Sequence, residues 1–238
     1  MSQKENNPNV EKERYFKRFT VNQVLQHLGI MITFSLLVIT GMPIKYNDQW
    51  WAPIVIDILG GYEMRSLIHH AAGIGMVLIG LYHVIYYLVI DRGPKAVLPD
   101  ADLKDLKDFW QLMKYYFGKA EFPKYARYSW KEKFDYWGAL WGMVIMCVSG
   151  PVLLYPPFWN ALPLSFVHIM HIIHSDEALL ATLAIVIWHW WNVHYNPDLF
   201  PMSKVWVTGL IPERQMKAEH PLEYEEIMRQ LEEGEVEK

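Results

Sequence analysis

Four long apolar runs, separated by polar segments, dominate the pattern of hydrophobic and polar positions along the chain. They cover residues 21–44, 67–90, 134–155 and 162–193. Each run reaches or exceeds the roughly 20 residues that an α-helix needs to cross the hydrocarbon core of a bilayer. The pattern therefore predicts an all-α, integral membrane four-helix bundle.

Shorter amphipathic patterns lie between and after these runs. Apolar residues at helical spacing among charged ones predict a helix on the inner membrane surface before the third run, and an acidic, solvated helix in the tail. Two tryptophans ahead of the apolar segment 53–59 predict a short interfacial helix after the first run. The apolar residues of the helix before the third run are Leu103, Leu106, Trp110, Met113 and Phe117. Those of the tail helix are Leu222, Tyr224, Ile227, Met228 and Leu231. The two tryptophans after the first run are Trp50 and Trp51.

Basic residues are distributed unevenly around the four runs. Of the 22 lysines and arginines, five lie in residues 1–20, ten in residues 92–133 and five after residue 196, which leaves only Lys45 and Arg65 for the first external loop. The positive-inside rule then predicts that both termini and the long middle loop are cytoplasmic. The chain divides into a cytoplasmic N-terminal segment (1–20), a four-helix membrane domain (21–195) and a cytoplasmic acidic tail (196–238).

Composition narrows the chemistry that the chain can perform. Hydrophobic residues make up 52% of it, and we expect no nucleic-acid partner. The net charge of −4 says little, because what matters is where the basic residues lie. Cys147 is the single cysteine. An internal disulfide, a protein-ligated iron–sulfur cluster and a Cys-x-x-Cys-His haem attachment are therefore excluded.

Nine of the ten histidines lie in or beside the predicted spans, and they sort into two depths. Packing histidines need not sort in this way, whereas ligand sites built between the facing helices of a bundle would. The outer tier holds His69, His70, His168, His171 and His174, and the inner tier holds His27, His83, His189 and His194.

The fourth run carries a member of each tier on similar sides of one helix. His174 and His189 are fifteen residues apart, which corresponds to about 22 Å of rise and roughly 60° beyond a whole number of turns. Histidine is costly inside a membrane and usually marks function there. Two imidazoles stacked in this way indicate two haem irons, one above the other, against the alternative that both are hydrogen-bonded packing residues.

The inner tier leaves a choice of ligand. His27 lies near the cytoplasmic end of the first run. His83 follows His69 by fourteen residues and shares its face of the second run, so both ligand pairs could instead come from the second and fourth spans. His70 lies off that face, and we expect it to be a bystander.

Several short motifs occur in a characteristic order. His27 is followed by Thr40-Gly41, and Leu67-Ile68-His69 is followed by Gly73. Lys133-Phe-Asp-Tyr-Trp137 lies at the start of the third run, and Ser149-Gly150 lies near its end. The fourth contains His174-x-x-x-Ala178 and His189.

This ordered set, over residues 15–195, resembles the cytochrome b subunit family of respiratory formate dehydrogenases and membrane nickel–iron hydrogenases. The stretch from His194 to Met202 further resembles a branch of that family associated with multihaem cytochrome c partners. Three features depart from the family pattern: a spacing of fifteen rather than fourteen in the fourth span, Ser129-Trp130-Lys131 where the family has Asn-x-Gly, and the additional His83.

The resemblance implies two non-covalent b-type haems held by four histidines. His69 and His174 would ligate the outer haem iron, and His27 and His189 the inner one, with His83 as the alternative to His27. A quinone pocket would lie between the inner haem and residues 128–135, where Glu132, Lys133 or Asp135 could carry protons.

The function expected from these features is that of the electron-transfer, quinone-reactive subunit of a respiratory oxidoreductase in the cell inner membrane. Electrons would pass between the quinone pool and an external, periplasmic redox subunit such as a multihaem cytochrome c or an iron–sulfur protein. Two other classes stay open. One is a haem-free proton or ion transporter in which histidines, Asp176 and Glu177 form a relay. The other is a haem-bearing transmembrane reductase that uses no quinone.

Overall fold

The computed structural model describes residues 13–90, 97–98, 103–155, 157, 161–197 and 199–234. Regular structure within these residues is almost entirely helical, and four of the helices are long and apolar enough to cross a membrane. The predicted all-α membrane bundle is confirmed.

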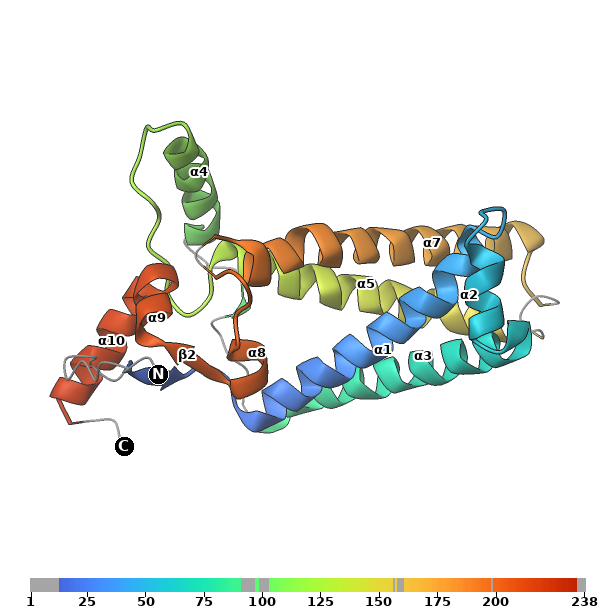
Figure 1. Cartoon of the computed structure of the whole chain (residues 1–238), viewed down its shortest axis with the longest axis horizontal. Coiled ribbons are helices and arrows are strands. Elements are labelled where there is room, and N and C mark those ends of the chain that lie inside the picture. Colours follow the sequence, from blue (N-terminus) through green and yellow to red (C-terminus); the bar gives the residue numbers. More distant parts are fainter. Residues whose placement is uncertain are drawn as a thin grey trace, which may run out of the picture.

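The four spans lie alongside one another on the long axis of the molecule (Figure 1). Large apolar side chains such as Leu67, Trp141 and Leu180 are more than 60% exposed along them, as expected for a surface that faces lipid. Their bounds are α1 (Val21–Lys45), α3 (Gly61–Ile85, continued by the π-helical Tyr86–Ile90), α5 (Trp130–Leu154) and α7 (Leu164–Leu183, continued by the π-helical Ala184–His189 and Trp191–Tyr195).

The bundle is built from two helix pairs. Helix α1 packs along α3, and α5 packs along α7, whereas contacts between the two pairs are sparser and involve mainly α1 with α7. Side chains that reach from one pair toward the other therefore determine what the middle of the bundle can hold.

We call the end of the bundle that carries His27 and His189 the inner end, and the end that carries His69 and His174 the outer end. Two helices begin at the inner end with the same capping motif. Thr20 caps α1 and Ser129 caps α5, and each hydroxyl accepts a hydrogen bond from the backbone N–H three residues later. The side chains of Gln23 and Glu132 return a bond to the cap residue, which completes a capping box and specifies where the helix starts.

The outer end of the bundle is closed by a short helix and an ion pair. Helix α2 (Ala52–Ile58) follows Trp51, in agreement with the short helix expected there. Lys45 at the end of α1 binds Asp176 of α7, with 2.5 Å between Nζ and Oδ1, and its ammonium also donates to the Ser175 hydroxyl. This pair ties the two halves of the bundle together at their outer ends.

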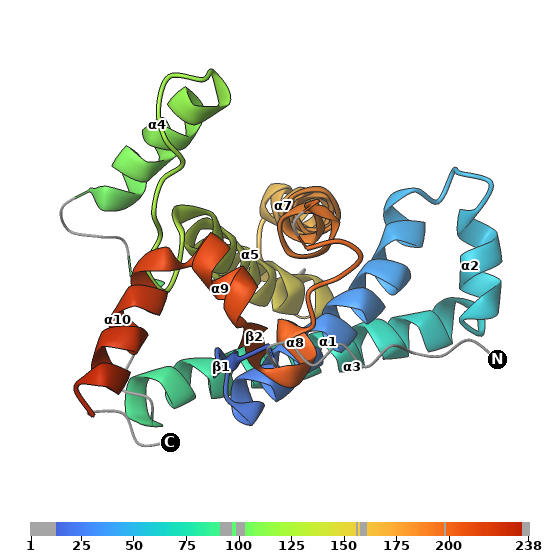
Figure 2. The same ribbon diagram turned by 60° about the vertical axis from the view of Figure 1, so that its left-hand side comes forward.

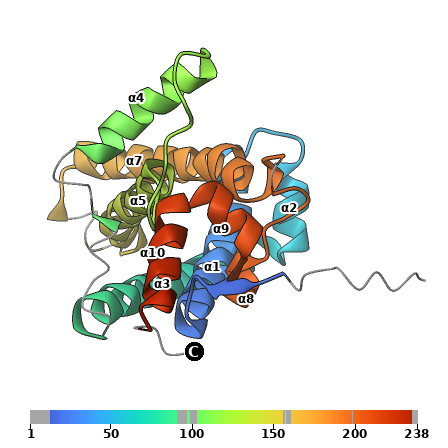
Figure 3. The same cartoon turned by 90° about the vertical axis from the view of Figure 1, so that its left-hand side faces the viewer.

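The remaining elements gather at the inner end, with α4 projecting sideways from the bundle (Figure 2). The first and last described elements lie at this same end (Figure 3), the arrangement expected from the distribution of basic residues. These elements are β1 (Tyr15–Lys17), α4 (Lys104–Tyr116), α8 (Val205–Thr208), β2 (Leu210–Pro212), α9 (Glu213–Glu219) and α10 (Pro221–Glu232).

The tail is folded onto the inner end of the bundle. Strand β2 pairs antiparallel with β1, and a small apolar cluster of Val205, Ile211 and Met216 lies beside them. The Glu223 carboxylate binds two arginines, Arg18 at 2.5 Å and Arg127 at 2.6 Å. The tail helices are therefore anchored to the N-terminal strand and to the loop before α5, in addition to being amphipathic.

Candidate functional site

Four of the span histidines form two pairs across the bundle. His69 of α3 faces His174 of α7, with 6.4 Å between ring centroids, and His27 of α1 faces His189 with 6.3 Å between ring centroids. An imidazole nitrogen binds a metal at about 2.0–2.1 Å, which puts the ring centroid about 3.2 Å from that metal. Each pair therefore has the separation that one metal between two imidazoles requires.

Separation alone does not make a pair of ligands. The rings of His69 and His70 are also 6.2 Å apart, but they belong to adjacent residues whose directions differ by about 100° on the helix. His70 is exposed. The two cross-bundle pairs differ from it because their imidazoles come from different helices.

The outer pair is held by two hydroxyls in matching positions. The Nδ1 atom of His69 lies 2.8 Å from the Thr40 hydroxyl, and the Nδ1 atom of His174 lies 2.9 Å from the Ser149 hydroxyl. Thr40 donates its own hydrogen to the Leu36 carbonyl and Ser149 donates its hydrogen to the Ile145 carbonyl. Both hydroxyl oxygens must therefore accept from the imidazoles.

This assignment determines the tautomer of both outer histidines. With the proton on Nδ1, the Nε2 atom of each ring carries a free lone pair, and within the described part of the chain it has no hydrogen-bond partner. A histidine that donates one ring N–H to a fixed acceptor and leaves the other nitrogen free is the usual arrangement of a metal ligand.

Glycines adjoin the two outer imidazoles. A Cβ atom on Gly41 would come within 3.3 Å of the His69 Cε1 atom, and one on Gly150 within 3.5 Å of the His174 Cε1 atom. These are the glycines that directly follow Thr40 and Ser149 in sequence. Each helix pair thus contains one hydroxyl residue that accepts from the histidine, followed by a glycine that leaves space beside the imidazole ring.

The inner pair has different supports. The Nδ1 atom of His189 lies 3.1 Å from a carboxylate oxygen of Asp135 on α5. A carboxylate oxygen accepts here, so His189 donates from Nδ1, and its Nε2 atom has no hydrogen-bond partner among the described residues. The Nδ1 atom of His27 is buried and has no hydrogen-bond partner among the described residues.

His83, the third imidazole at the inner level, has both ring nitrogens engaged. Its Nδ1 atom lies 2.8 Å from the Gln26 carbonyl oxygen, and its Nε2 atom lies 3.1 Å from the Tyr136 hydroxyl. Because the amide oxygen is an acceptor, Nδ1 donates and Nε2 accepts from the tyrosine. No lone pair is left over for a metal in this arrangement.

The other histidines and acids of the expected sites lie elsewhere. His168 and His171 are exposed near the outer end of α7, and His194 stacks edge-on against Trp206 at the inner end. Asp176 is bound to Lys45, and Lys133 is bound to Asp105, with 3.0 Å between the charged atoms. Of the three proton carriers expected from the sequence, Asp135 is the one that contacts a paired histidine.

Glu177 lies at the α5–α7 contact, one turn below His174. Its Oε1 atom would be 2.7 Å from a Cβ atom placed on Gly142. Gly138 and Gly142 are four residues apart, a small-residue pattern typical of close helix contacts, and Gly142 provides such a contact. A Cβ on Gly138 would meet nothing within 4 Å.

Two residues near these groups were not singled out from the sequence. Arg65 lies one turn before His69, donates to the Thr40 carbonyl at 2.9 Å, and has a buried Nε without a partner in the described structure. His220 is 4% exposed and is held between Arg18 and the Ala126 carbonyl. Burial lowers its pKa below the usual value, and Glu132 opposes that effect.

No group of three or more histidine, cysteine, aspartate or glutamate side chains suited to a metal ion occurs among the described residues. The candidate centres are therefore pairs, and a group that they hold must bring its other ligands with it. A porphyrin supplies four nitrogens and leaves two axial positions open.

The fold and the site together define an all-α membrane bundle with two imidazole pairs at different depths. Known proteins of similar sequence include cytochrome b subunits of formate dehydrogenase. The cytochrome b556(fdo) subunit of formate dehydrogenase from Escherichia coli K12 is 20% identical over 218 residues, which cover 90% of this chain and 94% of the relative. The subunits of the same name from the O6:H1 and O157:H7 strains match to the same extent. No family model matches the chain.

Proposed function

We propose that the chain is the di-haem cytochrome b subunit of a respiratory redox complex, and that it moves electrons across the inner membrane between quinone and an external partner. The observation that carries the proposal is the state of the paired imidazoles. Three of the four donate from Nδ1 to a fixed acceptor, so that a free nitrogen is left on each ring.

The similar E. coli proteins support the first part of this proposal. They are named as cytochrome b subunits of formate dehydrogenase, and the match extends over nearly their full length. An electron-transfer role in a membrane oxidoreductase complex is the function that the present chain would share with them. Formate itself is not implied, since substrate chemistry in such a complex belongs to other subunits.

His69 and His174 would hold the outer haem, and His27 and His189 the inner one. His27 is favoured over His83 because the His83 nitrogens are already used by Gln26 and Tyr136, whereas the buried Nδ1 of His27 is unpaired. When bound, haem supplies reversible one-electron chemistry at iron. The protein's part is to ligate, to exclude water and to set the charge around each ring.

The residues present fit such a group in two further respects. Gly41 and Gly150 leave room beside the outer imidazoles, where added side chains would press on the rings. Arg65 offers a guanidinium near the outer pair, and its Nε atom has no partner among the described residues, which suits it to a porphyrin carboxylate. Glycines and a buried arginine also occur where helices simply pack together. A bound macrocycle would need both the space beside the imidazoles and a cation for its carboxylates.

The external partner is a separate redox subunit, either a multihaem cytochrome c or an iron–sulfur protein. The described outer end consists of little more than α2 and the turns around it, and it contains no cysteine. In this proposal the residues 21–195 form the electron-transfer domain, and the segments 1–20 and 196–238 lie in the cytoplasm.

Haem content and visible spectra test this function directly. The purified full-length chain should contain close to two extractable b-type haems and give a reduced-minus-oxidised spectrum. A folded preparation without Soret absorption would overturn the proposal and favour a haem-free transporter. His27→Ala should lose the inner haem and His83→Ala should keep it. The reverse result would move the inner ligand to His83.

A further inference from the structure

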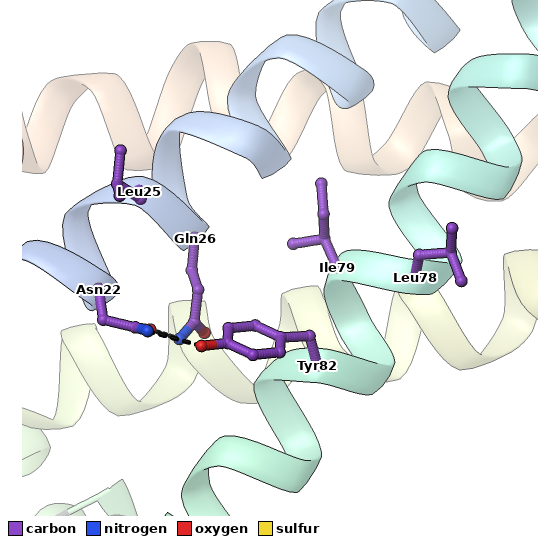
Figure 4. A pocket seen from close by; sticks show the side chains of 6 residues that line it. All are labelled: Asn22, Leu25, Gln26, Leu78, Ile79 and Tyr82. Atoms are coloured by element: carbon purple, nitrogen blue, oxygen red, sulfur yellow. Dashed lines mark hydrogen bonds between the residues drawn. The ribbon is translucent and has the colours of Figure 1, made fainter.

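A groove lies between the inner ends of α1 and α3 and opens toward the lipid-facing side of that helix pair. Its volume is about 350 Å³, within the range of roughly 300–1,000 Å³ typical of small-molecule sites. In Figure 4 the polar side chains meet at one end of the groove and the apolar ones line the rest. The lining residues are Asn22, Leu25, Gln26, Leu78, Ile79 and Tyr82.

The polar end belongs to a chain of hydrogen bonds that crosses three helices. Starting on α5, Tyr136 donates to Nε2 of His83, whose Nδ1 donates to the Gln26 carbonyl oxygen. The Gln26 amide then donates to the Asn22 carbonyl oxygen, and Asn22 donates to the Tyr82 oxygen at 2.6 Å. Every hydrogen along this chain points toward the groove.

The chain ends in an unused donor. Tyr82 accepts the bond from Asn22, and its own hydroxyl hydrogen has no acceptor among the described residues. Hydrogen bonds that run in one direction polarise one another, so the last hydroxyl of the chain is a stronger donor than an isolated phenol. A ligand that completes the chain must bring an acceptor oxygen into a mostly apolar groove.

We propose that this groove binds the ring of a membrane quinone, with a ring carbonyl accepting from Tyr82 and the isoprenoid chain lying along Leu25, Leu78 and Ile79. The inference rests on the proposed function, which requires quinone near the inner imidazole pair. Asn22 lies five residues from His27, or about 7.5 Å along α1. The site differs from the pocket expected near residues 128–135, where Glu132 and Lys133 are committed to a helix cap and an ion pair.

Binding of a naphthoquinone with a short isoprenoid chain to the purified protein in nanodiscs, with its haem content measured alongside, tests the hydrogen bond. Tyr82→Phe removes the donor, together with the oxygen that accepts from Asn22, and should weaken binding about three- to tenfold. Tyr62→Phe is the matched control because Tyr62 lies at the outer end of the same helix and is 64% exposed. It should bind the quinone as the wild type does.

A second pair of variants tests the groove itself. Leu78→Trp would fill the space between α1 and α3 and should abolish binding. Leu81→Trp introduces the same bulk three residues later, at a position that does not line the groove, and should leave binding unchanged. Unchanged affinity in both Tyr82→Phe and Leu78→Trp would overturn the proposal.

A lipid ester also carries a carbonyl and could use the same donor. If a short-chain diacylglycerol displaced the bound quinone as effectively as unlabelled quinone does, the groove would be a general lipid-binding site. That result would also overturn the proposal. Haem content, measured on the same samples, separates the two inferences. Two haems with quinone binding insensitive to the groove variants would refute the groove alone. Groove-dependent quinone binding without haem would refute the proposed function alone.

Discussion

The outer and inner imidazole pairs share one geometry but have different surroundings. Their ring separations are 6.4 and 6.3 Å. The outer histidines both donate to neutral hydroxyls, Thr40 and Ser149, in matching positions on two helices. At the inner level His189 donates to a carboxylate, while Nδ1 of His27 has no described partner. The two outer histidines therefore have nearly equivalent hydrogen-bond partners, whereas only one of the two inner histidines contacts a carboxylate.

This difference has an electronic consequence if each pair holds an iron. A carboxylate draws the Nδ1 proton more strongly than a hydroxyl does, which makes the other nitrogen a better electron donor. Stronger donation stabilises the oxidised metal. The inner centre should therefore have the lower reduction potential of the two.

Removing one histidine from each level should have the largest effect. His174→Ala and His189→Ala should each lose one haem, and the two spectra should lack different components, because the histidines are about 22 Å apart along the helix. Haem quantification and low-temperature difference spectra check this. His168→Ala is the control on the same helix. If both variants lost the same component, the two-level arrangement would be wrong.

Bulk beside the outer ring should damage that level selectively. Gly41→Val would bring a branched side chain against His69, since a Cβ atom alone would already lie within 3.3 Å. We expect most of the outer haem to be lost and the inner haem to be retained. Gly73→Ala is a mild control because its Cβ would meet only Leu37 at 3.9 Å. Equal loss at both levels would indicate general unfolding.

Replacing Asp135 with asparagine removes the negative charge beside His189 and keeps nearly the same side-chain shape. Asp135→Asn should raise the inner potential by about 59 mV or more, the equivalent of a tenfold change for one electron. Ser149→Ala at the outer level should change the outer potential by less, because a neutral hydroxyl perturbs the imidazole weakly. Redox titrations of both variants measure the two shifts. Similar shifts at both levels would remove the proposed asymmetry.

The smallest expected effect lies at the inner end of the bundle, at His220. Burial lowers its pKa in the folded protein, so below about pH 6.5 the unfolded chain binds more protons there and stability falls as the pH falls. The melting temperature of the wild type should drop by a few degrees more than that of His220→Gln between pH 7.5 and 5.5. His168→Gln, an exposed control, should behave as the wild type. An identical drop in His220→Gln would show that His220 does not contribute.

Predictions from the sequence were most complete where a property follows from spacing along one helix. The four spans were located to within a few residues at most ends, because twenty consecutive apolar residues have few structures open to them in a membrane. The second span begins earlier than expected, at Gly61, since polar residues of its first turns were assigned to the loop. The spacing of His174 and His189 predicts that both lie on one helix, and α7 with its π-helical continuation carries both.

The choice among His27, His83 and His189 could not be made in that way. All three lie at comparable depth, and a linear pattern does not say which nitrogen of an imidazole is already used. The neighbours on which the proposed preference for His27 rests are Gln26 and Tyr136, which contact His83 from two other helices. The amphipathic pattern of the tail predicts a solvated helix and gives no sign that His220 is buried, whereas Arg18 and Ala126 contact it from distant parts of the chain.

The sequence by itself thus determined the number of helices long and apolar enough to cross a membrane. It also predicts their orientation, from the placement of lysine and arginine, and the depth of each histidine, from its position along a span. These properties depend on local hydrophobicity and on the fixed geometry of an α-helix. Only the tertiary structure decided which histidines meet, which ring nitrogens are free, and where a groove opens between α1 and α3. Those properties depend on side chains from separate helices that approach within hydrogen-bonding distance, and such contacts arise only when the helices pack.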